Sequence, residues 1–315
     1  MLRTAICLHL LLAASQAADL RFKPAPAGEF DFNTGVLSGK LRAGGKSIGL
    51  LPVVHVPTGA VLTRSMGLAG HYRVFSGTGR SQSPPSPLTP VRYGNGAWDW
   101  PSDATLRRDG SVEVHWPAAE DRPFEMWAVY AFSAPATLEV ETRVRARAEL
   151  PAFESLLASY FAESFTESLV CARGDDGAAT FLPAEESHGV WQIFPRDPDA
   201  RSLIRDGRWK LEPHPVDWAV RPALAHPLAF RRDPKSGTTA ILMAPPDDCF
   251  AVATPHQTEP HFSLYFSLFG RTLKPGELAR ARVRLLIAAS PTAGDILDLY
   301  RAYLRASTMA QPYRY

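Results

Sequence analysis

The chain has 315 residues, of which 45% are hydrophobic and 21% are charged, and its formal net charge is +2 at pH 7. A length of this order can bury a large core, either in one large β domain or in two small ones. The near balance of charges excludes the strongly basic surface that is typical of proteins bound to nucleic acid or to anionic membranes, so we expect no nucleic-acid partner.

The first 17 residues have the pattern of a secretion signal peptide. Arg3 supplies a positive charge ahead of a largely apolar run at residues 5–14, and Ser15 and Ala17 place small residues where a signal peptidase reads them. The run is too short to cross a bilayer as a stable helix, and no later stretch is apolar for long enough. We therefore expect the mature chain, residues 18–315, to be periplasmic or extracellular, with no integral membrane segment after cleavage.

The first half of the mature chain is a succession of short strand patterns separated by Gly- and Pro-containing turns. The candidate strands lie at residues 30–32, 35–41, 46–56, 60–63, 66–75, 105–106, 111–116, 124–132 and 137–148. A Ser-, Pro- and Gly-rich stretch at residues 77–90 is predicted to be an exposed loop. In residues 137–148 apolar and charged side chains alternate, which indicates a strand with one buried and one solvated face.

The second half contains two less regular segments. Residues 153–171 are compatible with a helix or with a pair of strands. Residues 181–222 have little periodicity, which is typical of a functional loop set or of disorder, and their Trp content argues against disorder. The later hairpins are predicted at residues 227–231 with 238–243 and at residues 261–269 with 279–288. A helix is predicted over residues 291–306, capped by Thr292.

Many antiparallel strands with few helices require two sheets packed face to face. We therefore predict an all-β fold: a large two-sheet antiparallel supersandwich with a short C-terminal helix at residues 291–306, forming a single domain over residues 18–315. Two cysteines, Cys171 and Cys249, remain after processing. They could pair in an oxidising compartment or be two unrelated buried thiols.

The last predicted hairpin resembles that of a known group of proteins. Residues 261–269 (HFSLYFSLF), then residues 273–278 (LKPGEL) and a closing hydrophobic strand, are similar to the final hairpin of galactose-mutarotase-like supersandwich proteins. That group includes aldose epimerases and the sandwich domains of many polysaccharide lyases and glycoside hydrolases. Residues 70–75, 98–101 and 112–117 look similar to secreted bacterial proteins of that type.

The resemblance implies sugar chemistry in a groove on one sheet. Aldose epimerases use a mid-chain His as general acid on the ring oxygen and a late Glu as general base on the anomeric hydroxyl. His188 and Glu259 occupy the corresponding places in chain order. Because the sequence around His188 differs from the signature of the family, lyase, hydrolase and epimerase activities all stay open.

A polar segment ahead of the last hairpin carries most of the candidate acid/base groups. His256, Glu259 and His261 lie within six residues, so they could act in proton transfer or form half of a zinc site. A second pair of metal ligands is not evident, and we assign no metal site and identify no cofactor. The alternative is a polar loop that only enters a strand. The candidate catalytic residues are His188, His256, Glu259 and His261.

Two further segments are candidates for substrate binding. Because alternate residues of a strand share a face, His71 and Arg73 could together hold an anionic sugar, although a His satisfied by hydrogen bonds at a sheet edge is the alternative. In the segment that follows Gly96, indole rings could stack on sugar rings and a carboxylate could hold hydroxyls, or the indoles could seal the end of the sandwich. The candidate binding residues are His71, Arg73, Trp98, Asp99, Trp100 and Trp191.

The sequence therefore predicts a secreted carbohydrate-active protein with a saccharide ligand. Its chemistry would be acid/base catalysis of the lyase, hydrolase or epimerase type. For hydrolysis by two carboxylates, Glu163 with Glu167 or Asp247 with Asp248 are possible pairs, and nothing selects either. The alternatives are a non-catalytic carbohydrate-binding protein and a structural envelope protein.

Overall fold

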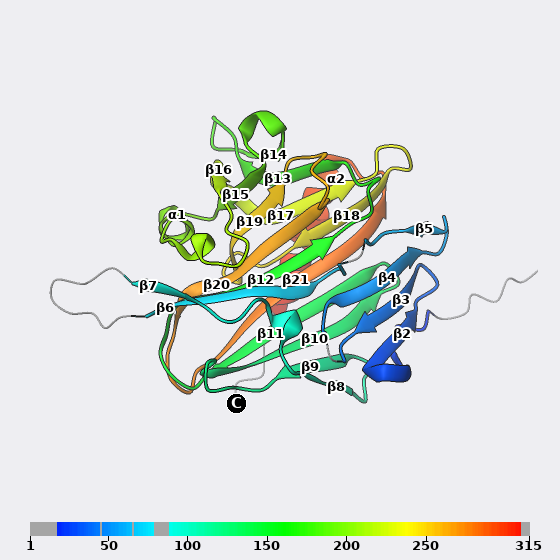
Figure 1. The fold of residues 1–315 in the computed structure, drawn as a ribbon. Helices are drawn as coiled ribbons and strands as arrows, with labels where there is room; N and C mark the ends of the chain where they lie inside the picture. The colour runs from blue at the N-terminus through cyan, green and yellow to red at the C-terminus, as the bar shows by residue number, and fades with distance from the viewer. Residues whose placement is uncertain (1–17, 45, 65, 79–87, 310–315) are drawn as a thin grey trace, which may run out of the picture.

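The computed structural model describes residues 18–44, 46–64, 66–78 and 88–309 (Figure 1). The predicted signal peptide and most of the predicted loop at residues 77–90 lie outside the described residues. Strands dominate the described part and pair into three sheets, which confirms the predicted all-β class. Among the described residues, no helix combines the length with the apolar composition of a membrane span.

Two large sheets form the sandwich. The nine-stranded sheet contains, in spatial order, β14 (Ala179–Pro183), β13 (Glu167–Arg173), β17 (Leu224–Arg232), β18 (Thr238–Met243), β21 (Leu278–Ala289), β11 (Thr137–Ala146), β10 (Phe124–Ala134), β9 (Val112–Trp116) and β8 (Asp103–Leu106). The seven-stranded sheet contains β16 (Trp218–Val220), β15 (Trp191–Pro195), β19 (Cys249–Pro255), β20 (Ser263–Leu273), β12 (Leu150–Tyr160), β6 (Gly70–Thr78) and β7 (Thr89–Arg92). All neighbours pair antiparallel except β15 with β16.

A third, smaller sheet precedes them in the chain and was not expected from the sequence. It contains β1 (Lys23–Pro24), β2 (Glu29–Asn33), β3 (Leu37–Arg42), β4 (Gly49–His55) and β5 (Ala60–Val61), drawn in blue in Figure 1. The rings of Phe22 and Phe32 lie 5.3 and 4.9 Å from the ring of Phe132 in β10, which joins this sheet to the main core. The prediction of two sheets was therefore incomplete.

The interior between the large sheets follows from the alternation in the strands. Val140 and Val144 of β11 are buried in the same apolar cluster as Phe266 of β20. On the other face of β11, Glu139 forms an ion pair of 2.6 Å with Arg284 of β21. The predicted buried and solvated faces of this strand are thus confirmed.

The segments that the sequence left open are resolved as strands and short helices. Residues 153–160 belong to β12 and residues 167–171 to β13, with a turn between them. Residues 181–222 contain β15, β16 and the helix α1 (Pro198–Ile204). The single-turn helices are η1 (Pro26–Gly28), η2 (Ala97–Asp99), η3 (Glu186–His188) and η4 (Arg208–Lys210). Cys171 and Cys249 are both buried and free, so the two-thiol alternative holds.

The C-terminal helix α2 spans Ala293–Met309, slightly later than predicted. Thr292 caps it: its hydroxyl accepts a hydrogen bond from the backbone N–H of Asp295 at 3.2 Å, and the Asp295 carboxylate accepts one from the N–H of Thr292 at 2.8 Å. Ile296 and Tyr300 are buried in an apolar cluster with Ile241 of β18, so α2 covers the outer face of the nine-stranded sheet.

Candidate functional site

The seven-stranded sheet has one face toward the nine-stranded sheet. Its other face is covered by the segment that connects β15 to β16, and a cleft of about 510 Å³ lies between this face and that segment. The cleft has the size and the mostly aromatic lining of a small-molecule site. Its lining residues are Met66, Tyr72, Arg73, Trp98, Leu156, Tyr160, Trp191, Trp209, His214, Pro215, Val216, Trp218, His261 and Tyr265. Of the residues predicted from the sequence, this set brings together Arg73, Trp98, Trp191 and His261.

A β-bulge in β6 places two neighbouring residues, Tyr72 and Arg73, at the cleft. Along the β6–β12 pair, His71 lies opposite Leu157 and Val74 lies opposite Ser155, so β6 carries one residue more than its partner. The extra residue breaks the alternation of side chains at this point. Both Tyr72 and Arg73 therefore line the cleft.

The same bulge leaves His71 on the opposite face, in the interior of the sandwich. Its Nε2 lies 2.7 Å from the hydroxyl oxygen of Thr142 in β11, and its ring centroid lies 5.5 Å from that of Trp116. Complete burial lowers the pKa of His71 to about 3. The prediction that His71 and Arg73 share a face is wrong, because strict alternation does not hold across a bulge.

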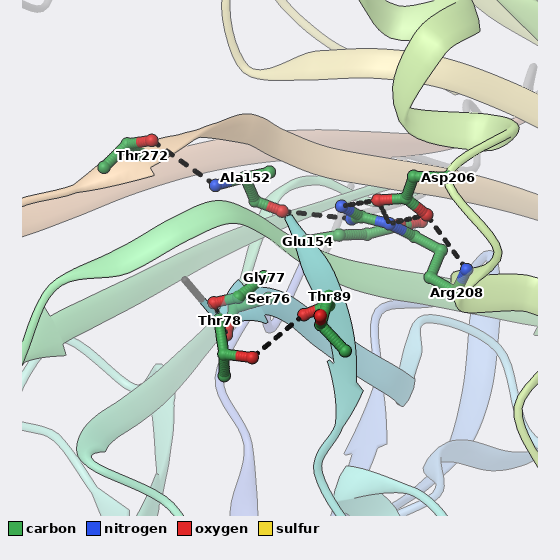
Figure 2. A network of polar contacts seen from close by, with 9 residues as sticks. All are labelled: Ser76, Gly77, Thr78, Thr89, Ala152, Glu154, Asp206, Arg208 and Thr272. Atoms are coloured by element: carbon green, nitrogen blue, oxygen red, sulfur yellow. Dashed lines mark hydrogen bonds and ion pairs between the residues drawn. The ribbon is translucent and has the colours of Figure 1, made fainter. Parts of the chain in front are cut away.

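A buried arginine, Arg208, anchors the segment that covers the cleft to the sheet below it (Figure 2). Arg208 in η4 donates from Nη1 to Oε2 of Glu154 and to the backbone oxygen of Ala152 in β12, both at 3.0 Å. Its Nη2 donates to Asp206 at 2.8 Å. Burial raises the pKa of the Glu154 carboxyl, and the charge of Arg208 opposes part of that shift. This arrangement fixes the adjacent Trp209 above the cleft.

One wall of the cleft is a stack of two rings, Tyr72 and Trp98, with centroids 4.1 Å apart and planes 19° apart. Beyond this wall lies a second hollow of about 350 Å³, which Asp99 lines. Asp99 forms an ion pair of 3.0 Å with Lys46 there. Trp98 thus lines both hollows, whereas Asp99 lines only the second one.

Trp100 does not lie at the cleft. Its ring packs in the main core, with its centroid 6.0 Å from that of Phe124 and the guanidinium of Arg122 4.1 Å from its own. Trp100 therefore fits the alternative interpretation, in which the indole ring packs at the end of the sandwich and does not bind a sugar.

Glu259 and His261 form a carboxylate–imidazole pair at the edge of the cleft. Nδ1 of His261 lies 2.7 Å from Oε1 of Glu259, and the backbone N–H of His261 donates to Oε2 at 2.9 Å. The Glu259 side chain is 11% exposed and that of His261 is 51% exposed. Because Nδ1 faces the carboxylate, the opposite nitrogen, Nε2, is left to act on a ligand.

A second buried arginine, Arg231 of β17, supports the segment that carries this pair. Its guanidinium is completely buried, and burial lowers its pKa. It donates 2.9–3.4 Å hydrogen bonds to the backbone oxygens of Phe165, Pro255, Gln257 and Ser263 and to the hydroxyl of Thr254. Arg231 therefore fixes both ends of the loop that contains Glu259.

Two tyrosines line the cleft near this pair. Burial raises the pKa of Tyr265 to about 12 and that of Tyr160 well above its ordinary value. Both phenols are therefore neutral at physiological pH and offer hydroxyl groups for hydrogen bonding to a ligand.

The remaining candidates lie elsewhere. His188 is half exposed in η3 with its Nδ1 3.8 Å from Glu185, and Nδ1 of His256 lies 3.5 Å from the hydroxyl of Thr258. Neither lines the cleft. The proposed carboxylate pairs are also outside it: Glu163, Glu167, Asp247 and Asp248 are all absent from its lining. Among the described residues, no group of three or more His, Cys, Asp or Glu side chains is placed to hold a metal ion.

Several cleft residues were not singled out from the sequence. They are Met66, Tyr72, Leu156, Tyr160, Trp209, His214, Pro215, Val216, Trp218 and Tyr265. The irregular, aromatic-rich stretch at residues 181–222 was the available signal for Trp209, His214 and Trp218. The tyrosines carried no such signal, because a Tyr in a strand is ordinary.

No family model matches the chain, and no curated protein matches it in sequence. Among solved structures it is similar to the Slr1438 protein of Synechocystis sp. PCC 6803, with 12% identity and a TM-score of 0.54 over 87% of this chain and 98% of that one. This likeness shows a shared fold.

Other similar structures have lower TM-scores. The galactose 1-epimerase of Lactobacillus acidophilus has 14% identity and a TM-score of 0.49 over 86% of this chain and 99% of that one. The α-N-acetylgalactosaminidase NagBb of Bifidobacterium bifidum has 12% identity and a TM-score of 0.48 over 89% of this chain and 38% of that one. At these identities the similarity concerns the fold alone.

Proposed function

We propose that this protein binds a saccharide in the aromatic cleft and catalyses a proton-transfer reaction on it. His261 acts as the acid/base group, and Glu259 orients it. The observation that carries the proposal is the Glu259–His261 pair, with 2.7 Å between carboxylate and imidazole, at the edge of a cleft lined by four Trp and three Tyr side chains.

The lining suits a sugar ring. Flat indole faces pack on the apolar C–H faces of a pyranose, and neutral phenols exchange hydrogen bonds with its hydroxyls. Trp191 and Trp218 meet edge to face, with their centroids 6.2 Å apart, and Trp191 lies 5.1 Å from His261. A ring held against Trp191 would therefore lie beside the imidazole.

The chemistry of the pair favours proton transfer. A carboxylate on Nδ1 selects the tautomer with a free Nε2 and stabilises the imidazolium that forms when Nε2 takes a proton. No Asp or Glu appears among the described residues that line the cleft. The two facing carboxylates that hydrolysis requires are therefore absent from this lining. Epimerisation through ring opening and β-elimination each break one C–O bond while an acid/base group moves a proton, which a single imidazole can do.

The location proposed for this activity is the periplasm or the exterior of the cell. The N-terminal pattern of a charge, an apolar run and small residues supports it. Appearance of the mature chain, starting near residue 18, in the periplasmic or culture fraction of an expressing bacterium would test it, and retention of the full chain in the cytosol would contradict it.

The catalytic proposal is tested with Glu259→Gln and His261→Gln on a panel of oligosaccharides. Mass spectrometry detects unsaturated or hydrolysed fragments, and NMR detects inversion at a carbon. We expect both variants to lose about 10²-fold or more in turnover while ligand affinity stays within a few-fold. His188→Ala and His256→Ala are the matched controls, since neither residue lines the cleft, and they should retain full turnover.

Two results would contradict the proposal. If Glu259→Gln and His261→Gln turn over substrate as the unmodified protein does, the pair is not the acid/base group. If saccharides bind in the cleft and none is converted, the protein is a carbohydrate-binding protein without catalysis.

A further inference from the structure

Arg73 is a buried cation without an acidic partner in the described part of the chain. The side chain is 3% exposed and lines the cleft. Its Nη2 donates a 2.5 Å hydrogen bond to the backbone oxygen of His214. Its Nε and Nη1 are buried and have no hydrogen-bond partner among the described residues. A buried guanidinium with unused donors is unfavourable unless something else satisfies it.

The other two fully buried arginines around the site show what a structural role requires. Arg208 uses all three of its nitrogens and is neutralised by Glu154 and Asp206. Arg231 also uses all three nitrogens, in bonds to oxygens of the chain. Arg73 differs from both, because two of its nitrogens remain unused at the cleft.

The guanidinium of Arg73 is also held in one orientation. It lies 5.2 Å from the ring of Tyr72 and 5.2 Å from the ring of Trp209. Arg208 fixes Trp209, and the bulge fixes Tyr72. A guanidinium clamped in this way is preorganised for an oxyanion, since little side-chain freedom remains to be lost on binding.

Positive charge predominates in the lining of the main cleft. Burial and the charge of Arg73 lower the pKa of the neighbouring Arg92, which lines the second hollow behind Tyr72. No described carboxylate lines the main cleft. A ligand with a negative group would therefore gain both the unused hydrogen bonds and the Coulomb attraction.

We propose that the cleft is selective for a saccharide with an anionic group and that Arg73 binds that group. This inference rests on the proposed function for the saccharide and adds its chemical class. The shared chemistry is an oxyanion on a sugar, which either a uronic acid carboxylate or a sulfate ester provides. Arg73 is a binding residue here, and the proton transfer stays with His261.

The test is calorimetric binding of matched sugars to the mature protein. The probes are D-galacturonate against D-galactose, D-glucuronate against D-glucose, and galactose 6-sulfate against galactose. We expect the anionic member of at least one pair to bind about tenfold or more tightly, as a charge-assisted hydrogen bond allows. Preference for the acids identifies a uronate ligand, and preference for the ester identifies a sulfated one.

Arg73→Met should abolish that preference while the affinity for the neutral sugar changes little. Arg122→Met is the matched control, because Arg122 is also buried and stacked on a Trp ring but lies outside the cleft. It should leave the preference unchanged. If Arg73→Met does not fold, the dependence of affinity on salt concentration in the unmodified protein tests the inference instead. Affinity for the anionic sugar must then fall as ionic strength rises, and affinity for the neutral sugar must stay constant.

The outcomes separate this inference from the proposed function. Equal affinity for neutral and anionic sugars, or a preference that survives Arg73→Met, overturns the anionic class and leaves the acid/base proposal standing. A preference that depends on Arg73, together with full turnover by Glu259→Gln, supports the inference and overturns the proposed chemistry. Failure of every sugar to bind overturns both.

Discussion

Nη1 of Arg208 lies 3.0 Å from Oε2 of Glu154, and both side chains are completely buried (Figure 2). The pair joins η4, in the segment above the cleft, to β12, a central strand of the seven-stranded sheet. Because Trp209 follows Arg208 directly, this single contact connects the stability of the fold to the shape of the cleft.

Arg208→Met is expected to destabilise the protein by about 3–5 kcal/mol, because it leaves the Glu154 carboxylate buried without its partner. Urea denaturation of the variant measures this free energy. The double variant Arg208→Met, Glu154→Gln should recover part of the loss, since the charge of Glu154 is then no longer stranded and only Asp206 is left without its partner. A single variant within about 1 kcal/mol of the unmodified protein would contradict a tight buried pair.

Two tryptophans that the sequence placed in one group should behave in opposite ways. Trp191 is partly exposed at the cleft, so Trp191→Ala should weaken saccharide binding by roughly tenfold with a modest loss of stability. Trp100 is 6% exposed in the main core, so Trp100→Ala should cost about 3–5 kcal/mol in unfolding free energy with an unchanged Kd. Calorimetric titration and thermal denaturation of both variants measure the difference. The same effect on Kd from both would refute the assignment.

His71 predicts a loss of stability in mild acid. Burial lowers its pKa from 6.5 to about 3 in the folded state, so between these values the unfolded chain binds a proton that the folded protein does not. This contribution is fully present above about pH 6.5 and falls as the pH drops toward 3, by about 2 kcal/mol between pH 7 and pH 5. Unfolding free energies at both pH values measure it. His71→Gln should flatten the dependence, and an identical slope in that variant would assign it to other groups.

Arg231→Lys keeps the charge but cannot reach the five oxygens that the guanidinium bonds. We expect a loss of about 2–4 kcal/mol in unfolding free energy, because buried carbonyls lose their donors. Turnover should fall as well, since the loop that positions Glu259 and His261 loosens. The exposed Arg145→Lys is the control and should change neither quantity. Unchanged turnover in folded Arg231→Lys would show that the loop holds its geometry without this arginine.

The features that were predicted correctly are those that depend on neighbouring residues in the sequence. Residues 137–148 alternate cleanly, and the strand, its buried face and its solvated face were all predicted correctly. Glu259 and His261 were predicted, together with His256, as acid/base candidates because the three residues lie within six positions of a short polar segment. The contact between Nδ1 and the carboxylate is a local event, so sequence proximity was a sound guide.

The bulge in β6 was not predictable from the residues that form it. His71, Tyr72 and Arg73 fit a regular strand as well as an irregular one, and only the pairing with β12 introduces the extra residue. The register of a strand depends on its partner, which lies more than 75 residues away in sequence. Alternation therefore assigned His71 to the wrong face.

The all-β class, most strands, the C-terminal helix and the aromatic richness of the segment over the cleft follow from local periodicity and composition, so they could be predicted from the residues alone. The positions of the aromatic residues at the cleft could not, and neither could the placing of Trp98 at the cleft and Trp100 in the core, nor the unused donors of Arg73. Burial and partner choice depend on contacts between distant segments, as with Arg208 and Glu154, and on how the sheets pack.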